Sequence, residues 1–128
     1  MTTWDLSQTK SHILICNGGS CKRQGAEELT NSLREEISRR QLNTDIHTTK
    51  SYCNGRCQDA CVVTVYPEGT WYKDLSESDV KPFIQSLHTG QTYETKESLH
   101  FNQEGFQPVN DTIAKGMPKD LEQKNFKK

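Results

Sequence analysis

The spacing of apolar residues changes along the first half of the chain, and each spacing predicts one element. Residues 12–15 form a short apolar run whose length and β-branched side chains predict a buried strand. Across residues 24–40, apolar residues recur every three or four positions, which predicts an amphipathic helix. Four residues define the buried face of that helix: Ala26, Leu29, Leu33 and Ile37. Residues 45–51 are again rich in β-branched residues and predict a second strand.

The next part of the pattern predicts a hairpin followed by a second helix. Two β-rich runs, residues 62–66 and 70–73, flank a Pro-Glu-Gly turn, which is typical of a hairpin. The helix is expected to start near Ser78, with some irregularity before it, because Pro82 then lies in the first turn, where its missing N–H costs little. A cap at Ser76 would place the proline deeper. The order strand, helix, strand, hairpin, helix predicts an α/β fold.

The compact pattern ends at Gly90. We therefore divide the chain into an N-terminal arm (residues 1–11), a folded domain (residues 12–90) and a polar C-terminal extension (residues 91–128). Within the extension, scattered apolar residues allow a short strand pair: Tyr93, Leu99, Phe101 and Phe106. Residues 115–128 are polar enough to be disordered.

Composition excludes two classes of partner and favours one cellular location. The 128 residues carry 16 Lys and Arg against 17 Asp and Glu, so the chain lacks the basic character of a nucleic-acid-binding protein. The sequence has no run of about 18 apolar residues, so no membrane partner is expected either. The N-terminal residues lack the basic and apolar stretches of a secretory signal, which makes a cytoplasmic location the expectation.

Four of the five cysteines form two close pairs, Cys16-x4-Cys21 and Cys53-x3-Cys57, each in a glycine-bearing loop after a predicted strand. In a reducing cytoplasm, such clusters bind metals or act in catalysis more often than they form disulfides. Two loops that each offer two thiolates can converge on one inorganic centre, which suits a [2Fe–2S] cluster with one loop holding each iron. The sequence therefore predicts an electron-transfer protein with a [2Fe–2S] cofactor, and it offers no catalytic motif that would indicate an enzyme.

Groups around the cysteines can offset the negative charge of such a cluster. The backbone N–H groups of three loop glycines are free to approach sulfur: Gly18, Gly19 and Gly55. The helix that begins near Gln24 is expected to direct its positive N-terminal end toward Cys21. Three basic residues flank the loops and predict a rim that an acidic patch on a redox partner would recognise: Lys22, Arg23 and Arg56.

Three other interpretations fit parts of the cysteine pattern. A structural zinc site with four cysteine ligands has similar loop spacings and would make the chain a binding or adapter module without redox activity. A dithiol redox protein usually carries C-x-x-C, which this chain lacks. Four inert, buried thiols are disfavoured, because both pairs are flanked by glycine and polar residues.

The fifth cysteine and the histidines have weaker assignments. Cys61 continues the three-residue spacing after Cys57, so it is a candidate alternative ligand or a residue that touches the ligands. The apolar Val62 and Val63 that follow it favour a position in the core. The four histidines are scattered and are expected to be surface or structural residues: His12, His47, His88 and His100.

With the cysteine loops placed, residues 12–88 resemble the thioredoxin-like [2Fe-2S] ferredoxin family. The resemblance rests on the two cysteine pairs and on the Tyr-Pro-x-Gly-x-Trp-Tyr hairpin at residues 66–72, and it covers more than half of the chain. It implies a thioredoxin-like sandwich, a cluster near the surface between the two loops, redox partner proteins and often a homodimer. The chain departs from the family at Ala60-Cys61, where many relatives have Gly-Pro.

A narrower resemblance links the chain to small ferredoxin-like proteins that accompany the anaerobic cobalamin pathway in bacilli. It rests on the Thr-Trp-Asp-Leu start and on the Cys-Asn-Gly-Gly and Cys-Asn-Gly-Arg-Cys loops. This resemblance implies that the chain supplies electrons in cobalamin biosynthesis.

Overall fold

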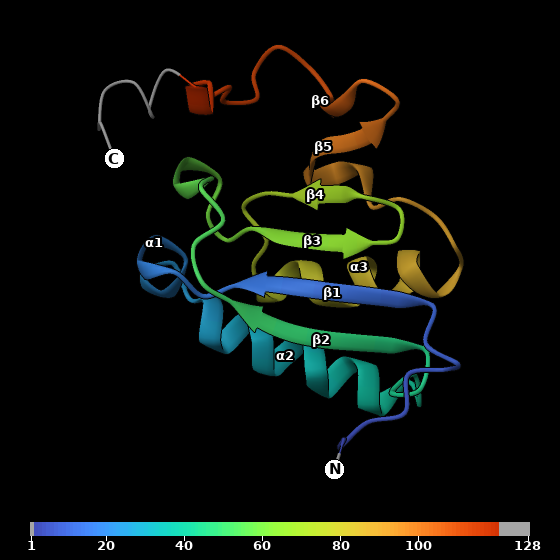
Figure 1. Cartoon of the computed structure of the whole chain (residues 1–128). Coiled ribbons are helices and arrows are strands. Elements are labelled where there is room, and N and C mark those ends of the chain that lie inside the picture. The colour runs from blue at the N-terminus through green and yellow to red at the C-terminus, as the bar shows by residue number, and fades with distance from the viewer. Residues whose placement is uncertain (1, 121–128) are drawn as a thin grey trace.

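Strand β1 (Ser11–Cys16) forms where the first apolar run predicts it, and it is buried because it pairs on both sides. It runs parallel to β2 (Ile46–Ser51) and antiparallel to β3 (Val63–Tyr66). Strand β4 (Thr70–Tyr72) pairs with β3, as the Pro-Glu-Gly turn predicts. The computed structural model, which describes residues 2–120, thus has the predicted α/β arrangement (Figure 1).

Two helices, α2 (Ala26–Arg39) and α3 (Val80–His88), pack against each other on one face of the sheet (Figure 1). The core lies between these helices and the strands. All four apolar residues predicted for the buried face of α2 are at most 2% exposed. The strands and α3 supply the other large buried side chains: Ile13, Ile15, Val63, Val65, Tyr72, Phe83 and Ile84.

A short helix that the sequence pattern does not predict precedes α2. This helix, α1 (Gly19–Arg23), ends before Gly25, whose φ of 97° is a left-handed conformation that favours glycine. The turn at Gly25 separates the two helices, so α2 begins at Ala26 rather than near Gln24. Cys21 therefore lies inside a helix of its own and not in a loop that leads into α2.

The residue that caps the start of the α3 region is not the serine that the sequence analysis favoured. Ser76, rather than Ser78, caps a 3-10 turn (Glu77–Asp79) that precedes the helix. The backbone N–H of Ser76 donates to the Asp79 carboxylate at 3.0 Å, which closes a capping box. Pro82 lies in the first turn of α3, as expected, and the 3-10 turn is the irregularity expected before it.

The C-terminal extension continues the sheet. Strand β5 (Glu97–Asn102) pairs antiparallel with β4, and β6 (Gly105–Pro108) pairs with β5, which confirms the expected strand pair. Gly69 is required where the extension packs, because a Cβ there would lie 2.7 Å from the Cβ of Phe101. The sheet order is therefore β2-β1-β3-β4-β5-β6. Of the residues predicted to be disordered, 121–128 lie outside the described residues.

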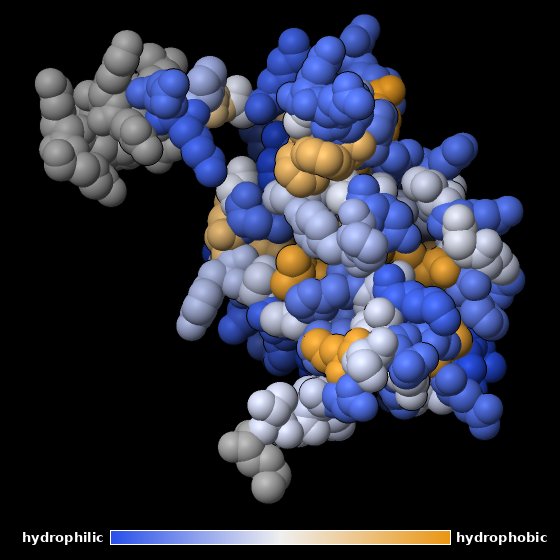
Figure 2. Space-filling model, turned by 45° about the vertical axis from the view of Figure 1, so that its right-hand side comes forward, coloured by the Kyte–Doolittle hydropathy of each residue, from blue (hydrophilic) through white to orange (hydrophobic). Residues whose placement is uncertain are grey.

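The surface is mainly polar. On the face seen in Figure 2, hydrophilic residues predominate, and the apolar ones form small separate patches. Across the described residues, no helix has the length and apolar character needed to cross a bilayer. Six large apolar side chains are exposed on the described surface: Trp4, Leu6, Tyr52, Phe101, Phe106 and Met117.

His12 and His47 lie side by side on adjacent parallel strands, a pairing that the sequence alone does not reveal. They are register partners in β1 and β2, and their ring centroids are 5.1 Å apart. His12 Nε2 and the Thr49 hydroxyl share a hydrogen bond of 2.8 Å. Burial, together with the proximity of His47, lowers the pKa of His12 below its usual value of 6.5.

Because the folded state lowers the pKa of His12, protonation of this side chain favours the unfolded chain. Its contribution to stability is therefore complete above the unfolded-state pKa, near 6.5, and is lost as pH falls below that value. We expect His12→Gln to flatten the change in the free energy of unfolding between about pH 7.5 and 5.5, measured with urea. The matched control is His88→Gln, at an exposed position of α3. A His12→Gln profile as steep as that of the wild type would contradict this assignment.

Candidate metal centre

The two cysteine loops meet at one edge of the sheet because the two strands that precede them are parallel. Cys16 is the last residue of β1, and Cys53 follows the end of β2 by two residues. The four paired cysteines line one small cavity. Four other residues complete its lining: Gly18, Ser20, Asn54 and Arg56. The structure thus brings together all four cysteines that the sequence singles out as ligands.

The two pairs differ in burial. Cys16 and Cys21 are each 2% exposed, whereas Cys53 and Cys57 are exposed at the surface. The Sγ atoms of the exposed pair are 3.6 Å apart. Among residues 2–120, no three His, Cys, Asp or Glu side chains converge closely enough to surround a single ion. The thiols are arranged instead as one inner and one outer pair around a shared cavity.

Close backbone contact holds the loops together. The N–H of Asn17 donates to the carbonyl of Ser51 at 2.8 Å, which continues the pairing of the parallel strands into the loops. A Cβ at Gly18 would lie 2.7 Å from the Cβ of Cys53 and 2.8 Å from its Cα. Only glycine allows this approach, so Gly18 is what lets the first loop close on the second.

Hydrogen bonds and burial set the state of the thiols. The N–H of Gly55 donates to Cys53 Sγ at 3.3 Å, as expected for a glycine of the cysteine loops. Burial, together with the neighbouring Cys16, raises the pKa of Cys21 to about 12. The protein environment therefore keeps this thiol protonated, and a bound metal must displace the proton.

Cys61 lies behind α1 and not on the cavity. Its side chain is 2% exposed, and the thiol donates to the carbonyl oxygens of Cys21 at 3.5 Å and Gln24 at 3.6 Å. Burial raises its pKa. Cys61 therefore packs as a small core residue that touches the backbone of α1, where Cys21 resides.

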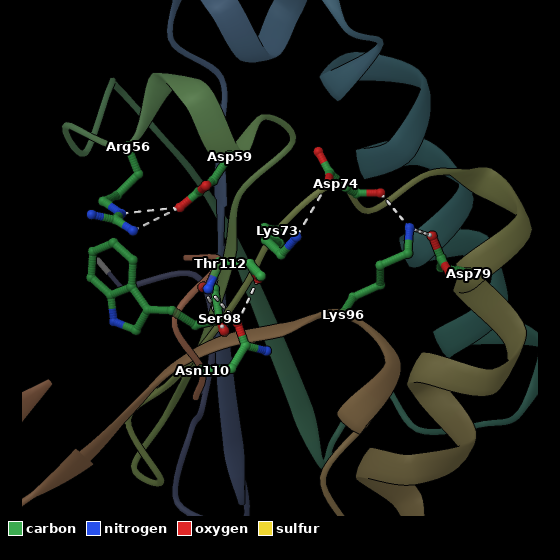
Figure 3. Close-up of polar contacts among 10 residues, drawn as sticks. Arg56, Asp59, Lys73, Asp74, Asp79, Lys96, Ser98, Asn110 and Thr112 are labelled. Carbon is green, nitrogen blue, oxygen red and sulfur yellow. Dashed lines mark hydrogen bonds and ion pairs between the residues drawn. The ribbon is translucent and has the colours of Figure 1, made fainter. Parts of the chain in front are cut away.

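Arg56 does not belong to a free basic rim. Its side chain is 15% exposed and forms an ion pair of 2.9 Å with Asp59 (Figure 3). Its guanidinium also donates to the carbonyl oxygens of Ala114 and Lys115 in the C-terminal extension. The prediction that Arg56 faces a partner is therefore wrong, because these groups already occupy its donors. The sequence analysis did not identify these partners of Arg56. Asp59 is only three residues away in the chain, but the two carbonyl groups are 58 and 59 residues away.

The other two basic residues are exposed. Lys22 lies 3.7 Å from Glu27, and its side chain is 55% exposed. Arg23 is also exposed and donates to the Ser20 hydroxyl at 3.2 Å. Both extend from α1, so the positive charge available at the surface lies beside the first loop and not the second.

An α/β sandwich that presents two cysteine pairs from neighbouring loops defines a class of iron–sulfur proteins with a thioredoxin-like fold. The chain belongs to the thioredoxin-like [2Fe-2S] ferredoxin family, whose model matches residues 5–88. The predicted thioredoxin-like fold is confirmed by a solved thioredoxin-like [2Fe-2S] ferredoxin from Aquifex aeolicus. The two chains are 25% identical with a TM-score of 0.70, over 80% of this chain and 99% of that one.

Two relatives are similar in sequence. A protein of Priestia megaterium, provisionally named a 2Fe-2S ferredoxin, is 43% identical over 122 residues, which are 93% of this chain and 94% of that protein. A 2Fe-2S ferredoxin of Clostridium pasteurianum is 32% identical over 85 residues, which are 60% of this chain and 83% of that protein. The chain is therefore an electron-transfer protein and not an enzyme, and its cofactor is a [2Fe–2S] cluster rather than a structural zinc ion.

The contact at Gly18 provides a test of how the site closes. Gly18→Ala adds a methyl group 2.7 Å from Cys53, so we expect a loss of about 1–3 kcal/mol in the free energy of unfolding and poor cluster incorporation. Gly19→Ala is the matched control, because its new Cβ meets only the flexible end of Arg23 at 3.4 Å. Urea unfolding and iron content per chain measure both effects. Equal iron content in the two variants would show that the loops can separate without cost.

Proposed function

We propose that Cys16, Cys21, Cys53 and Cys57 ligate the [2Fe–2S] cluster, with the first loop on one iron and the second loop on the other. The observation that carries this proposal is the single cavity that all four thiols line. The ligand chemistry fits, because a [2Fe–2S] cluster needs two thiolates for each iron and each loop offers two. The close approach at Gly18 fits too, since it holds both loops against the same space.

The unequal burial of the pairs suits an electron carrier. The bound cluster supplies one-electron chemistry. Cys53 and Cys57 are exposed, so this half of the site gives a redox partner a short path to the cluster. Cys16 and Cys21 are buried in the core, so the other half is shielded from water. The exposed Lys22 and Arg23 beside the first loop favour a partner with an acidic surface.

We propose further that the chain works in the cytoplasm and forms a homodimer. All five cysteines are free, which suits a reducing compartment. The exposed Phe101 and Phe106, whose rings lie 5.2 Å apart, offer an apolar surface for a second copy. Sedimentation equilibrium of the full chain would decide between monomer and dimer.

Residues 12–90 are the unit that we propose holds the cluster, and residues 1–11 and 91–128 are additions to it.

The ligand assignment predicts different outcomes for neighbouring cysteines. Cys57→Ala should lose or strongly alter the visible absorbance of the cluster, because one iron then lacks a thiolate. Cys61→Ala should keep that absorbance, because its thiol is buried behind α1. Wild-type protein purified without oxygen should contain about two irons and two acid-labile sulfides per chain. Loss of colour in Cys61→Ala but not in Cys57→Ala would move the ligand role to Cys61.

A role in cobalamin biosynthesis is a narrower proposal, supported by the resemblance of the N-terminal start and the cysteine loops. It requires that the reduced protein can pass electrons to a cobalt centre. We expect the chemically reduced chain, mixed without oxygen with a cobalt(II) corrinoid, to regain its oxidised spectrum as the cobalt is reduced. Cluster-free Cys57→Ala protein is the control. A wild-type protein that stays reduced in the presence of the corrinoid would exclude direct transfer, while leaving its role as an electron carrier intact.

A further inference from the structure

The C-terminal extension returns to the second cysteine loop after β6 (Figure 1). The contact is made by Ala114 and Lys115, within residues 113–116, which we call the strap. Arg56 Nη2 donates to the carbonyl of Ala114 at 2.5 Å, and Nη1 lies 3.5 Å from the carbonyl of Lys115. The same guanidinium pairs with the Asp59 carboxylate through Nε at 3.1 Å and Nη2 at 2.9 Å (Figure 3). One side chain of the cysteine loop thus joins the loop to the strap.

The strap has a defined conformation of its own. Ile113, at its start, is only 5% exposed although the residues on either side are more open. Gly116, at its end, has a φ of 74°, and a Cβ there would lie 3.9 Å from Arg56 Nη1. A buried side chain at one end and a left-handed glycine at the other direct the carbonyls between them toward Arg56. The conformation of the strap therefore favours its hydrogen bonds to Arg56.

Apart from the close approach of Gly18 to Cys53 and a hydrogen bond of 2.9 Å from the Asp74 N–H to the Asp59 carbonyl, the second cysteine loop has few fixed points. Between the end of β2 and the start of β3, regular structure is limited to a 3-10 turn (Cys57–Asp59). Its two cysteines are exposed, whereas Cys16 and Cys21 lie in regular elements within the core. Arg56 lies between the two exposed cysteines in sequence and also lines the cavity. Contacts that hold Arg56 in place therefore also help to hold the loop of Cys53 and Cys57.

We propose that Arg56 is a positioning residue that uses the strap to hold the loop of Cys53 and Cys57 in place and to keep a positive charge beside the cluster. This inference rests on the proposed ligand set. The planar guanidinium suits the task, because it can bridge a carboxylate and two carbonyls at once, which a lysine ammonium cannot do in the same geometry. The strap lies outside residues 5–88, the part of the chain that the family match covers. The extension thus adds to the family's cluster domain a support for its exposed ligands.

Two consequences follow for the bound cluster. Without the strap, the loop can open more often, so the cluster is lost faster to a competing chelator. Removal of the positive charge of Arg56 disfavours the reduced cluster, which carries one more negative charge, so the reduction potential becomes more negative. The first effect depends on the strap and the second on the charge, so different variants separate them.

The first experiment measures the decay of visible absorbance in excess iron chelator. Two variants should each lose the cluster about 10-fold faster than the wild type: Arg56→Lys in the full chain, and an otherwise wild-type chain that ends at Thr112. This factor is the lower end of the range of effects seen when residues that support metal ligands are changed. Combining the two changes should give no further acceleration, because both remove the contact between Arg56 and the strap, whereas a lysine can still pair with Asp59. Gly116→Val, which strains the left-handed turn without shortening the chain, should act in the same direction. Arg34→Gln, at an exposed position of α2 that does not line the cysteine cavity, is the control for lost charge.

A chain ending at Thr112 that keeps the wild-type rate would overturn the proposal. So would a 10-fold effect of Arg56→Lys that persists in the shortened chain, since Arg56 would then act without the strap. In voltammetry, Arg56→Gln should shift the potential to a more negative value while Arg56→Lys and Arg34→Gln should not. An unchanged potential in Arg56→Gln would overturn the part of the proposal that concerns charge.

A second measurement keeps this inference separate from the ligand assignment. In cluster-free protein, the rate at which iodoacetamide alkylates Cys57, read by peptide mass spectrometry, should rise several-fold in Arg56→Lys and in the chain ending at Thr112. The rate at Cys21, buried in the first pair, should not change. A wild-type protein that never binds iron would refute the ligand set alone, because this measurement needs no cluster. Unchanged alkylation of Cys57 would refute the strap.

Discussion

The parallel pairing of β1 with β2 is the constraint on which the site depends. Six register pairs, from Ser11 with Ile46 to Cys16 with Ser51, bring the ends of the two strands to the same level. The chain can make this connection only by a crossover, and α2 supplies it while burying its apolar face on the sheet. A shift of one residue would turn the side chains of one strand to the other face. The packing that fixes this register therefore also fixes where the two cysteine loops meet.

The two cysteine pairs of the site are held in place in different ways. Cys16 and Cys21 belong to the core, so the packing of the domain holds them, and the high pKa of Cys21 shows how strongly the interior disfavours a free thiolate. Bound iron removes that proton, which links cluster binding to the stability of the fold. Cys53 and Cys57 lie outside the core and depend on local contacts: the close approach of Gly18, the glycine N–H on Cys53 and the ion pair of Arg56. Exposure of this pair suits electron transfer, but it leaves the loop in need of support.

The sequence predicts the parts of this structure that depend on local patterns. Period and composition were enough for the first four strands and for α2, and the cysteine spacing was enough to group the thiols that share the cavity. The pattern did not reveal α1, because five residues with a single buried side chain carry no period. It also assigned Arg56 to a partner-binding rim, because a contact between residues 58 positions apart cannot be recognised from a local sequence pattern. The pairing of His12 with His47 was missed for the same reason, since it exists only once the register is known.

Besides the pairing of β5 with β4, side-chain contacts near the start of the extension and at the strap join it to the domain, and these two attachments have different consequences. Near its start, Lys96 reaches the buried Asp79 at 3.1 Å (Figure 3). The Tyr93 hydroxyl donates to the same carboxylate at 2.7 Å. These contacts help to hold the pKa of Asp79 below its usual value although burial acts to raise it. A chain cut at Gly90 would leave that carboxylate without both partners and would expose the edge of β4, so it would perturb the whole domain. A chain cut after Thr112 keeps both contacts and the β5–β6 pair, and it loses the strap together with the residues that follow it. The two attachments therefore separate a structural role of the extension from its effect on the cluster site.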